Sequence, residues 1–389
     1  MSEWKKVKLG EVCEISAGGD RPQIFSNHRT DKCRIPIYSN GIDNEGLYGF
    51  TDTPKNNGNA ITITGRGANA GTVFYRKDPF LSIIRLLTLT PNSEIINAKY
   101  LFYLLKNKTF LSTGSAQPQI TVPNISQFEI EFNPDIETQH RVATILSRYD
   151  SLIENYQKQI KLLEEAAQRL YKEWFVDLRF PGHENTKIVD GVPEGWEKKT
   201  IADVCTNISS GSTPSRSNKA YWENGTIKWV KTKELQDGWI LDTEEYISQE
   251  GYNSSSTKMF PVNTILMAIY ASPTLGRLGI LSIDCCCNQA ALGLIADENI
   301  ISWQWLFWKL YELRDEFNAI ARGAGQQNIS GIVVKNKEII IPNKGVIDGF
   351  TSVVSKMFEQ QKSLSFQLRL LTEARDRLLP KFMSGEITV

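Results

Sequence analysis

The sequence lacks residues and motifs on which several classes of protein depend. Its 389 residues include six cysteines and three histidines, with no Cys-x-x-Cys pair and no two neighbouring histidines, so we expect no metal site. No run approaches the roughly 20 apolar residues that span a membrane, and the polar N-terminus differs from a signal peptide. These absences predict a cytoplasmic protein with reduced thiols.

Sequence signatures of catalysis are also missing. The chain has no Gly-x-x-x-x-Gly-Lys-Ser/Thr loop for ATP, no Gly-x-Ser-x-Gly elbow and no His-Glu-x-x-His pair. Residues 322–325 lack the third spaced glycine of a dinucleotide-binding turn. We therefore expect a chain that is not an enzyme and binds no cofactor of its own.

The composition is that of a folded protein with more than one core. Hydrophobic residues make up 41% of the chain, and 44 Lys and Arg balance 44 Asp and Glu. A domain commonly has about 100 to 200 residues, so we expect at least two. Because the net charge is zero, contact with nucleic acid requires a local surplus of cations, and residues 1–124 hold 15 Lys and Arg against 10 Asp and Glu.

The chain repeats itself. Residues 4–13 match residues 196–205 at an offset of 192, and each segment continues into Ile, Ser and a Gly turn. Further along, residues 100–103 match residues 305–308 at an offset of 205. The Gly-Ser-Ala-Gln run that starts at Gly114 matches the Gly-Ala-Gly-Gln run at Gly323 at an offset of 209. Two similar halves are therefore expected.

Each half ends in a heptad pattern. From Tyr149 to Trp174, apolar residues recur in alternating steps of four and three, which is typical of a coiled-coil seam. A helix from 137 to 175 would be roughly 60 Å long, so we expect it to pair with its counterpart at an offset of 208, where Gln361 and Arg375 replace Ile153 and Ala167. The residues expected at this interface are Ile153, Tyr156, Ile160, Leu163, Leu170, Leu364, Leu368, Leu371 and Leu378.

Short β-type runs among Gly, Asn and Pro turns precede each helix. The predicted fold class is therefore α+β, with two mixed α/β domains, two long helices in an antiparallel coiled coil and an internal pseudo-twofold repeat. Pro and Gly interruptions place the expected boundaries at 1–134 and 181–342 for the mixed domains, and at 135–180 and 343–389 for the helical regions.

These features together resemble the specificity subunit of type I restriction-modification systems. The resemblance covers nearly the whole chain and rests on motifs that occur in order before each helix. Residues 211–215 look like the family's Gly-x-Thr-Pro turn, residues 137–139 open the first helix, and residues 170–177 and 382–387 close the two helical regions. The sequence departs from the family pattern at residues 18–22, which replace the Thr-Pro turn, and around 345–348, where a Glu-Gln pair is missing.

The resemblance implies a non-catalytic, DNA-binding subunit with two target recognition domains. Each reads one half of a bipartite, asymmetric site in double-stranded DNA, and the coiled coil sets the spacer between the halves. Two methyltransferase subunits dock on the coiled coil, and restriction subunits join the complex that these subunits form. S-adenosylmethionine, ATP and magnesium belong to those partners.

Candidate DNA contacts lie in loops that are similar in the two halves. Arg and Lys suit phosphate, and Gln or Asn can read adenine, but solvated loops, backbone capping and edge-strand protection explain the same residues. Lys231 and Lys233 are expected to alternate on one strand face beside Trp229. The full candidate set is Arg21, Arg66, Asn69, Gln117, Gln119, Thr213, Lys231, Lys233, Arg277, Gln326, Gln327 and Asn328.

Two other classes of protein make different predictions. A complete methyltransferase or nuclease would show cofactor-dependent activity as a pure chain. A non-catalytic coiled-coil scaffold, or a non-specific DNA-binding protein, would bind DNA in a salt-sensitive way without a preferred sequence.

Overall fold

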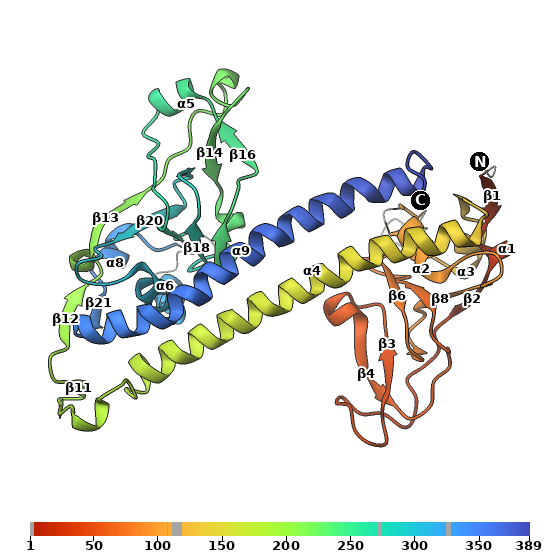
Figure 1. Ribbon diagram of the computed structural model, residues 1–389, viewed down its shortest axis with the longest axis horizontal. Coiled ribbons are helices and arrows are strands. Elements are labelled where there is room, and N and C mark those ends of the chain that lie inside the picture. Colours follow the sequence, from red (N-terminus) through yellow and green to blue (C-terminus); the bar gives the residue numbers. More distant parts are fainter. Residues whose placement is uncertain (1–3, 107, 111–118, 271–273, 324–327) are drawn as a thin grey trace. The chain divides into compact units, whose positions relative to one another are not determined.

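Two compact units make up the structure (Figure 1). The computed structural model describes residues 4–106, 108–110, 119–270, 274–323 and 328–389. The first unit combines residues 1–153 with residues 371–389, and the second consists of residues 154–370. Both ends of the chain therefore belong to the first unit.

The first unit is built from short strands and helices, as predicted. Its elements are β1 (Lys5–Lys8), α1 (Leu9–Val12), β2 (Cys13–Ala17), β3 (Ile35–Tyr38), β4 (Leu47–Thr51), β5 (Ala60–Ile63), β6 (Val73–Arg76), β7 (Leu81–Ser82), β8 (Leu87–Pro91), α2 (Ala98–Leu105), α3 (Val122–Ser126) and β9 (Glu129–Phe132).

The second unit repeats this succession and adds elements to it. Its elements are β10 (Ile188–Val189), β11 (Val192–Pro193), β12 (Glu197–Thr200), β13 (Cys205–Ser210), β14 (Ile227–Val230), β15 (Gly238–Ile240), β16 (Glu245–Ile247), α5 (Gln249–Asn253), β17 (Ile265–Ala268), β18 (Leu278–Leu281), β19 (Cys286–Cys287), β20 (Ala291–Ala296), α6 (Trp303–Glu312), α7 (Arg314–Gly323), α8 (Gly331–Lys335) and β21 (Glu338–Ile341).

The sheets of the two units correspond strand by strand. The main sheet has the order β2-β8-β5-β6 in the first unit and β13-β20-β17-β18-β15 in the second. A three-stranded sheet, β4-β3-β7 or β16-β14-β19, accompanies it and contains one parallel pair, β3 with β7 or β14 with β19. The second unit thus extends its main sheet by the short strand β15, which runs parallel to β18.

Each unit also contains a two-stranded antiparallel sheet whose alternating sequence matches its burial. β1 pairs with β9 and β12 pairs with β21 in the same antiparallel register, and β9 and β21 alternate between exposed and buried residues. Alternation is expected for a strand with one face on the core and one in water. Lys6 binds Glu129 across the first pair, and Lys198 binds Glu338 at the matching place in the second.

Equivalent helices in the two units carry the aromatic core. α2 and α6 begin at the N-cap residues Asn97 and Ser302, whose side chains accept hydrogen bonds from the backbone N–H groups of Tyr100 and Trp305. Such caps satisfy N–H groups that the first helical turn leaves unpaired. Most residues of the aromatic runs at 100–103 and 303–308 are buried on these helices.

Two long helices follow the β regions. α4 (Ile136–Tyr171) continues into a π-helical turn, Lys172–Val176, and α9 (Lys344–Met383) runs nearly to the C-terminus. The extent predicted for this helix, 137–175, is therefore correct, but from Lys172 to Val176 the chain forms a π-helical turn instead of an α-helix. Trp174 and Phe175 of the π-helical turn contact Phe350 of α9, and Phe175 also contacts Trp305 and Trp196.

Contacts between α4 and α9 occur in both units and follow an antiparallel order. In the first unit, Asp150 of α4 binds Arg375 of α9. In the second, Tyr171 near the end of α4 packs against Phe350 near the start of α9, with ring centroids 6.1 Å apart. Later residues of α4 therefore meet earlier residues of α9.

All six cysteines are free thiols, as expected. Among the helices that the structure describes, none combines the length and the apolar character needed to cross a membrane.

Candidate nucleic-acid interface and helical pair

The loop between β5 and β6 presents two of the candidate residues, Arg66 and Asn69. Both residues are exposed, and Gly67 and Gly71 within the loop have the positive φ angles of 84° and 97° that glycine adopts without strain. The backbone carbonyl of Asn69 accepts hydrogen bonds from the hydroxyls of Thr64 and Thr72. This bonding fixes the loop backbone and leaves the Asn69 side chain at the surface.

A second segment pairs with this loop and brings Gln119 to it. Arg66 and Gln119 form an isolated β-bridge, and Ile120 donates its backbone N–H to the carbonyl of Gly65 at 2.9 Å. The second unit repeats the arrangement, because Tyr270 bridges Asn328 and Ile329 donates to the carbonyl of Ile269 at 3.0 Å. Each unit thus brings together two loop segments that lie far apart in the sequence.

Three candidates, Gln117, Gln326 and Gln327, lie outside the residues that the structure describes. Arg277 is partly buried and immediately precedes β18. Arg21 is exposed and lies with its guanidinium carbon 5.0 Å from the ring centre of Phe25.

Thr213 belongs to a turn that the second unit holds tightly. Its hydroxyl donates to the side-chain oxygen of Gln289, and the indole N–H of Trp229 donates to the carbonyl of Ser212 at 2.9 Å. A Cβ atom on Gly211 would lie 2.1 Å from the carbonyl oxygen of Cys287, so only glycine fits the start of this turn. The turn therefore has a fixed position beside the strands β14 and β19.

The prediction that Lys231 and Lys233 alternate on a strand face is wrong. β14 ends at Val230, and both lysines lie at a 3₁₀ turn that spans Thr232–Glu234. Lys231 Nζ lies 2.5 Å from Glu245 and Lys233 Nζ 2.5 Å from Glu244. Hydrogen bonding to Glu245 raises the pKa of Lys231, so these cations are already paired within the chain.

The same unit holds an arginine that the sequence interpretation did not select. Arg216 stacks on Trp222, with 3.5 Å between its guanidinium carbon and the ring centre, and binds Glu245 at 2.6 Å. Half of the Arg216 side chain is exposed. A basic residue six positions before a tryptophan carries no recognisable signal, because the contact depends on the turn that brings them together.

The predicted seam residues occupy the helical pair with different degrees of burial. Ile153 and Leu364 are buried, Leu170 packs against the core of the second unit, and Leu378 packs against that of the first. The others are half-buried: Tyr156, Ile160, Leu163, Leu368 and Leu371.

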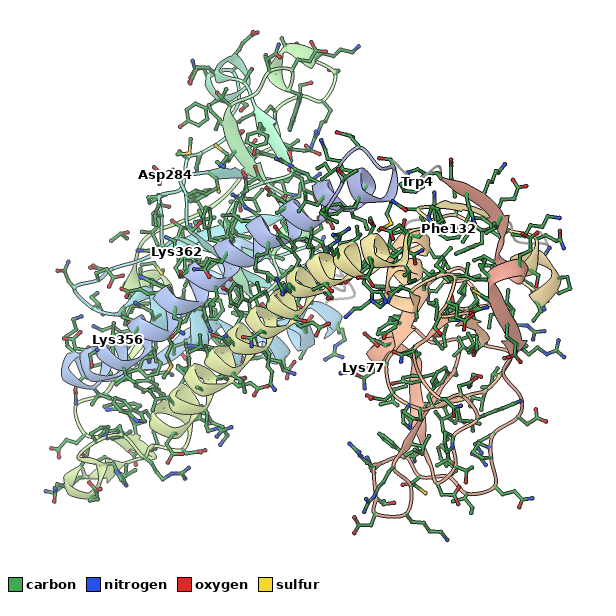
Figure 2. The ribbon with its side chains drawn as sticks, turned by 45° about the vertical axis from the view of Figure 1, so that its right-hand side comes forward. Trp4, Lys77, Phe132, Asp284, Lys356 and Lys362 are labelled. Atoms are coloured by element: carbon green, nitrogen blue, oxygen red, sulfur yellow. The ribbon has the colours of Figure 1, made fainter. Side chains whose placement is uncertain are left out.

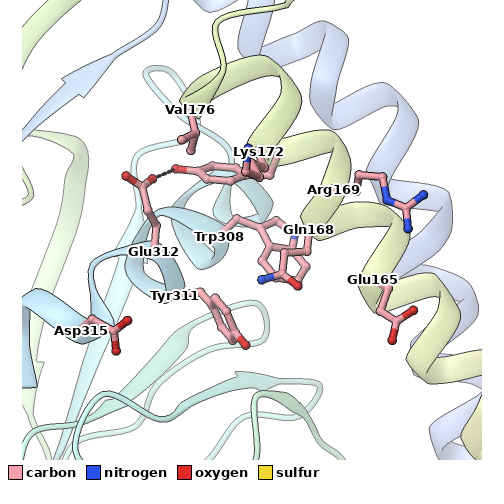
Figure 3. A pocket seen from close by; sticks show the side chains of 10 residues that line it. Glu165, Gln168, Arg169, Lys172, Val176, Trp308, Tyr311, Glu312 and Asp315 are labelled. Atoms are coloured by element: carbon pink, nitrogen blue, oxygen red, sulfur yellow. Dashed lines mark hydrogen bonds between the residues drawn. The ribbon is translucent and has the colours of Figure 1, made fainter. Parts of the chain in front are cut away.

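A pocket of about 540 Å³ opens where α4 meets α6 in the second unit (Figure 3). The Tyr171 hydroxyl donates to Glu312 at 2.6 Å, and Trp308 and Tyr311 supply aromatic walls. Burial and the adjacent Glu312 carboxylate raise the pKa of Tyr171 well above its usual value. Groups of His, Cys, Asp and Glu that could hold a metal are absent from the described residues.

Comparison with known proteins identifies the repeat. A family described as the type I restriction modification DNA specificity domain matches residues 1–165 and again residues 193–368. The chain belongs to this family. The two matches cover the two halves in which the strands and helices recur, so the internal repeat is a repeat of the specificity domain.

Two relatives that match most or all of the chain are specificity subunits of type I restriction enzymes. The chain is 29% identical to the type I restriction enzyme MjaIX specificity subunit of Methanocaldococcus jannaschii, over 85% of this chain and 78% of that protein. It is 26% identical to the HindI specificity subunit of Haemophilus influenzae, over the whole of both proteins. A crystal structure of a type I restriction-modification S subunit from M. genitalium shares the fold, with a TM-score of 0.70, 17% identity and coverage of 98% of this chain and 96% of that one.

Proposed function

We propose that this chain is the DNA sequence-recognition subunit of a type I restriction-modification complex. The observation that carries the proposal is the double match to the specificity domain, once in each half of the chain. Each half would read one part of a bipartite, asymmetric site in double-stranded DNA. The recognition domains are proposed at 1–134 and 181–342, and the helical regions at 135–180 and 343–389.

The paired loop segments suit base and phosphate contact. In the first unit, Arg66 and Asn69 lie on one segment and Gln119 on the segment beside it, and in the second unit Asn328 bridges Tyr270. Arginine binds phosphate or guanine, whereas Asn and Gln can make paired hydrogen bonds to adenine. Each loop pair therefore provides the kind of side chains that direct readout needs.

The helical pair supports a role in spacing and assembly. An α-helix rises 1.5 Å per residue, so the 36 residues of α4 extend over about 54 Å, longer than one turn of DNA. This length would set the spacer between the half-sites, and the outward faces of α4 and α9 would dock two methyltransferase subunits. Restriction subunits would join through that complex, in the cytoplasm, and S-adenosylmethionine, ATP and magnesium would be bound by the partners.

The test is to purify the chain with the methyltransferase encoded beside it and to map the methylated adenines in DNA that the complex has modified. We expect one bipartite motif with a fixed spacer. Modified sites without a shared motif, or a chain that recruits no methyltransferase, would favour a scaffold or non-specific DNA-binding protein.

Single substitutions sharpen the test because the two halves should act separately. Gln119→Ala should relax the motif in one half-site, and Asn328→Ala should relax it in the other. Loss of a paired base contact corresponds to about 1–3 kcal/mol of discrimination. Asn185→Ala, which removes an exposed amide outside the loop pairs and the helical pair, is the matched control and should leave the motif unchanged.

A further inference from the structure

Residues 231–244 connect β14 to β16 and contact α9 at two levels. The corresponding connection in the first unit, between β3 and β4, consists of residues 39–46 only. The longer connection contains β15, which extends the main sheet of the second unit. We call residues 231–244 the brace.

The first contact is made by Trp239 of β15. Its ring lies 6.5 Å from that of Phe358 on α9, measured between centroids. Lys362, which belongs to α9 (Figure 2), places its Nζ 5.0 Å from the centre of the Trp239 ring. A cation over an indole face is attracted by the negative potential of the ring.

The second contact is made by Asp242, just beyond β15. Its Oδ2 accepts a hydrogen bond from Nη1 of Arg369 on α9 at 2.8 Å. Its Oδ1 accepts from Nζ of Lys228 on β14 at 2.5 Å and from the hydroxyl of Tyr246 on β16 at 2.7 Å. One carboxylate therefore joins the helix to two strands of the three-stranded sheet.

The two contacts fall on one face of α9. Phe358, Lys362 and Arg369 are separated by four and seven residues, a spacing that returns to the same side of an α-helix. The brace also binds the rest of its own unit, because Asp237 accepts from both terminal nitrogens of Arg314 on α7. Helix, main sheet and three-stranded sheet are thus connected through one segment.

The equivalent positions of α4 have other partners. At the offset of 208, Asp150 stands for Phe358 and binds Arg375, and Lys161 stands for Arg369 and lies 3.8 Å from Glu165 of its own helix. The first unit therefore lacks the longer connection, and the equivalent positions of α4 lack the aromatic and arginine residues with which α9 contacts the brace.

We propose that the brace fixes the three-stranded sheet of the second unit on α9, with Asp242 and Arg369 as positioning residues, and so determines how strictly the second half-site and its spacing are read. This inference rests on the proposed function. The first unit, without a brace, would adjust its three-stranded sheet more freely when DNA binds.

The first experiment follows the fold alone and needs no DNA. Hydrogen exchange of the full chain is compared between wild type, Arg369→Met and Lys161→Met. Arg369→Met keeps the aliphatic stem and removes the charge, and we expect exchange in residues 227–247 to accelerate by about fivefold, the factor that corresponds to about 1 kcal/mol. Lys161→Met is the matched control at the equivalent position and should change nothing there. If hydrogen exchange in residues 227–247 is the same in Arg369→Met as in wild type, the brace does not fix the three-stranded sheet and the inference is wrong.

The second experiment maps methylated adenines for the complexes of the same variants. Arg369→Met should admit additional spacer lengths or bases in one half-site, with the preference for the wild-type site falling about fivefold, while the other half-site is read as it is by the wild-type complex. Arg369→Lys, which keeps a cation, should restore much of the preference. If Arg369→Met and wild type give the same map, the inference fails, whereas a wild-type complex without a bipartite motif would contradict the proposed function instead.

Discussion

The helical pair is packed with different chemistry in the two units. In the first unit, Asp150 accepts hydrogen bonds from the Tyr103 hydroxyl at 2.6 Å and from Arg375 at 2.9 Å. In the second unit the internal repeat places Phe358, Trp308 and Ala167 at the positions equivalent to Asp150, Tyr103 and Arg375. One layer of the repeat is thus a hydrogen-bonded trio and its counterpart is apolar.

The difference shows that the repeat preserves the position of a layer and not its chemistry. Phe358 lies among four aromatic rings, of which Trp303 is nearest with 5.0 Å between centroids. Arg375 and Asp150 have side chains 16% and 20% exposed, so their pairing must compensate for lost hydration. Both the polar and the apolar layer pack the helical pair, but only the polar layer needs a hydrogen-bond partner for each of its buried polar groups.

The largest effect is expected for Phe358→Ala. It removes a buried ring from the aromatic cluster and should destabilise the second unit by about 3–5 kcal/mol. Tryptophan fluorescence during denaturant unfolding measures this, because Trp4 is the only tryptophan of the first unit. A loss below about 1 kcal/mol would show that the cluster closes around the cavity.

A smaller effect is expected for Arg375→Met in the first unit. The substitution leaves Asp150 with Tyr103 alone and should cost about 1–3 kcal/mol, since a partly buried carboxylate loses a charged donor. Hydrogen exchange in α2 and the first half of α4 is the measurement. Arg377→Met, an exposed neighbour, is the control and should stay within about 0.5 kcal/mol of wild type.

Replacing the whole polar layer by apolar residues should have less effect than removing one of its partners. The triple variant Tyr103→Phe, Asp150→Phe, Arg375→Ala is expected to lie within about 1 kcal/mol of wild type, because replacing a whole ion pair by apolar groups is often neutral. Comparing the stability of the triple variant with the stabilities of the three single variants gives the interaction free energy among the three side chains. If the triple variant lost as much as the sum of the singles, the two layers would not be interchangeable.

The smallest effect concerns thiol reactivity at matched positions. Burial raises the pKa of both Cys13 and Cys205 to about 12, so on the order of one thiol in ten thousand is ionised at pH 8. We expect negligible alkylation of either in the native protein, followed with peptide-level mass spectrometry. In Phe358→Ala, Cys205 should become reactive at a lower denaturant concentration than in wild type, whereas the denaturant concentration at which Cys13 reacts should not change. An equal decrease for both thiols would mean that the two units unfold together.

Patterns with a long period were predictable from the sequence. The matches at 4–13 and 196–205 predicted the repeat of strands and short helices, and the steps of four and three predicted α4. The offset of 208 also singled out Arg375 and Gln361 as departures from the seam, both of which are wholly or partly buried. These inferences succeed because a heptad seam repeats the same physical requirement many times.

Short elements and local pairing were not predictable. β15 has three residues, and its place in the sheet follows from β18 beside it rather than from its own composition. The prediction that Lys231 and Lys233 lie on a strand fails because alternation over three positions also fits a 3₁₀ turn with two carboxylates near it. For Arg66 and Gln119 the sequence indicated suitable side chains but not that one would lie beside the other.

The sequence by itself determined the repeat, the family resemblance and the two helices, because each is encoded redundantly along many residues. Only the tertiary structure decided which charges are paired, which loops meet and how the brace reaches α9. Those contacts join residues as distant as Asp242 and Arg369, and a single carboxylate or guanidinium carries no local sign of the partner that folding will bring to it.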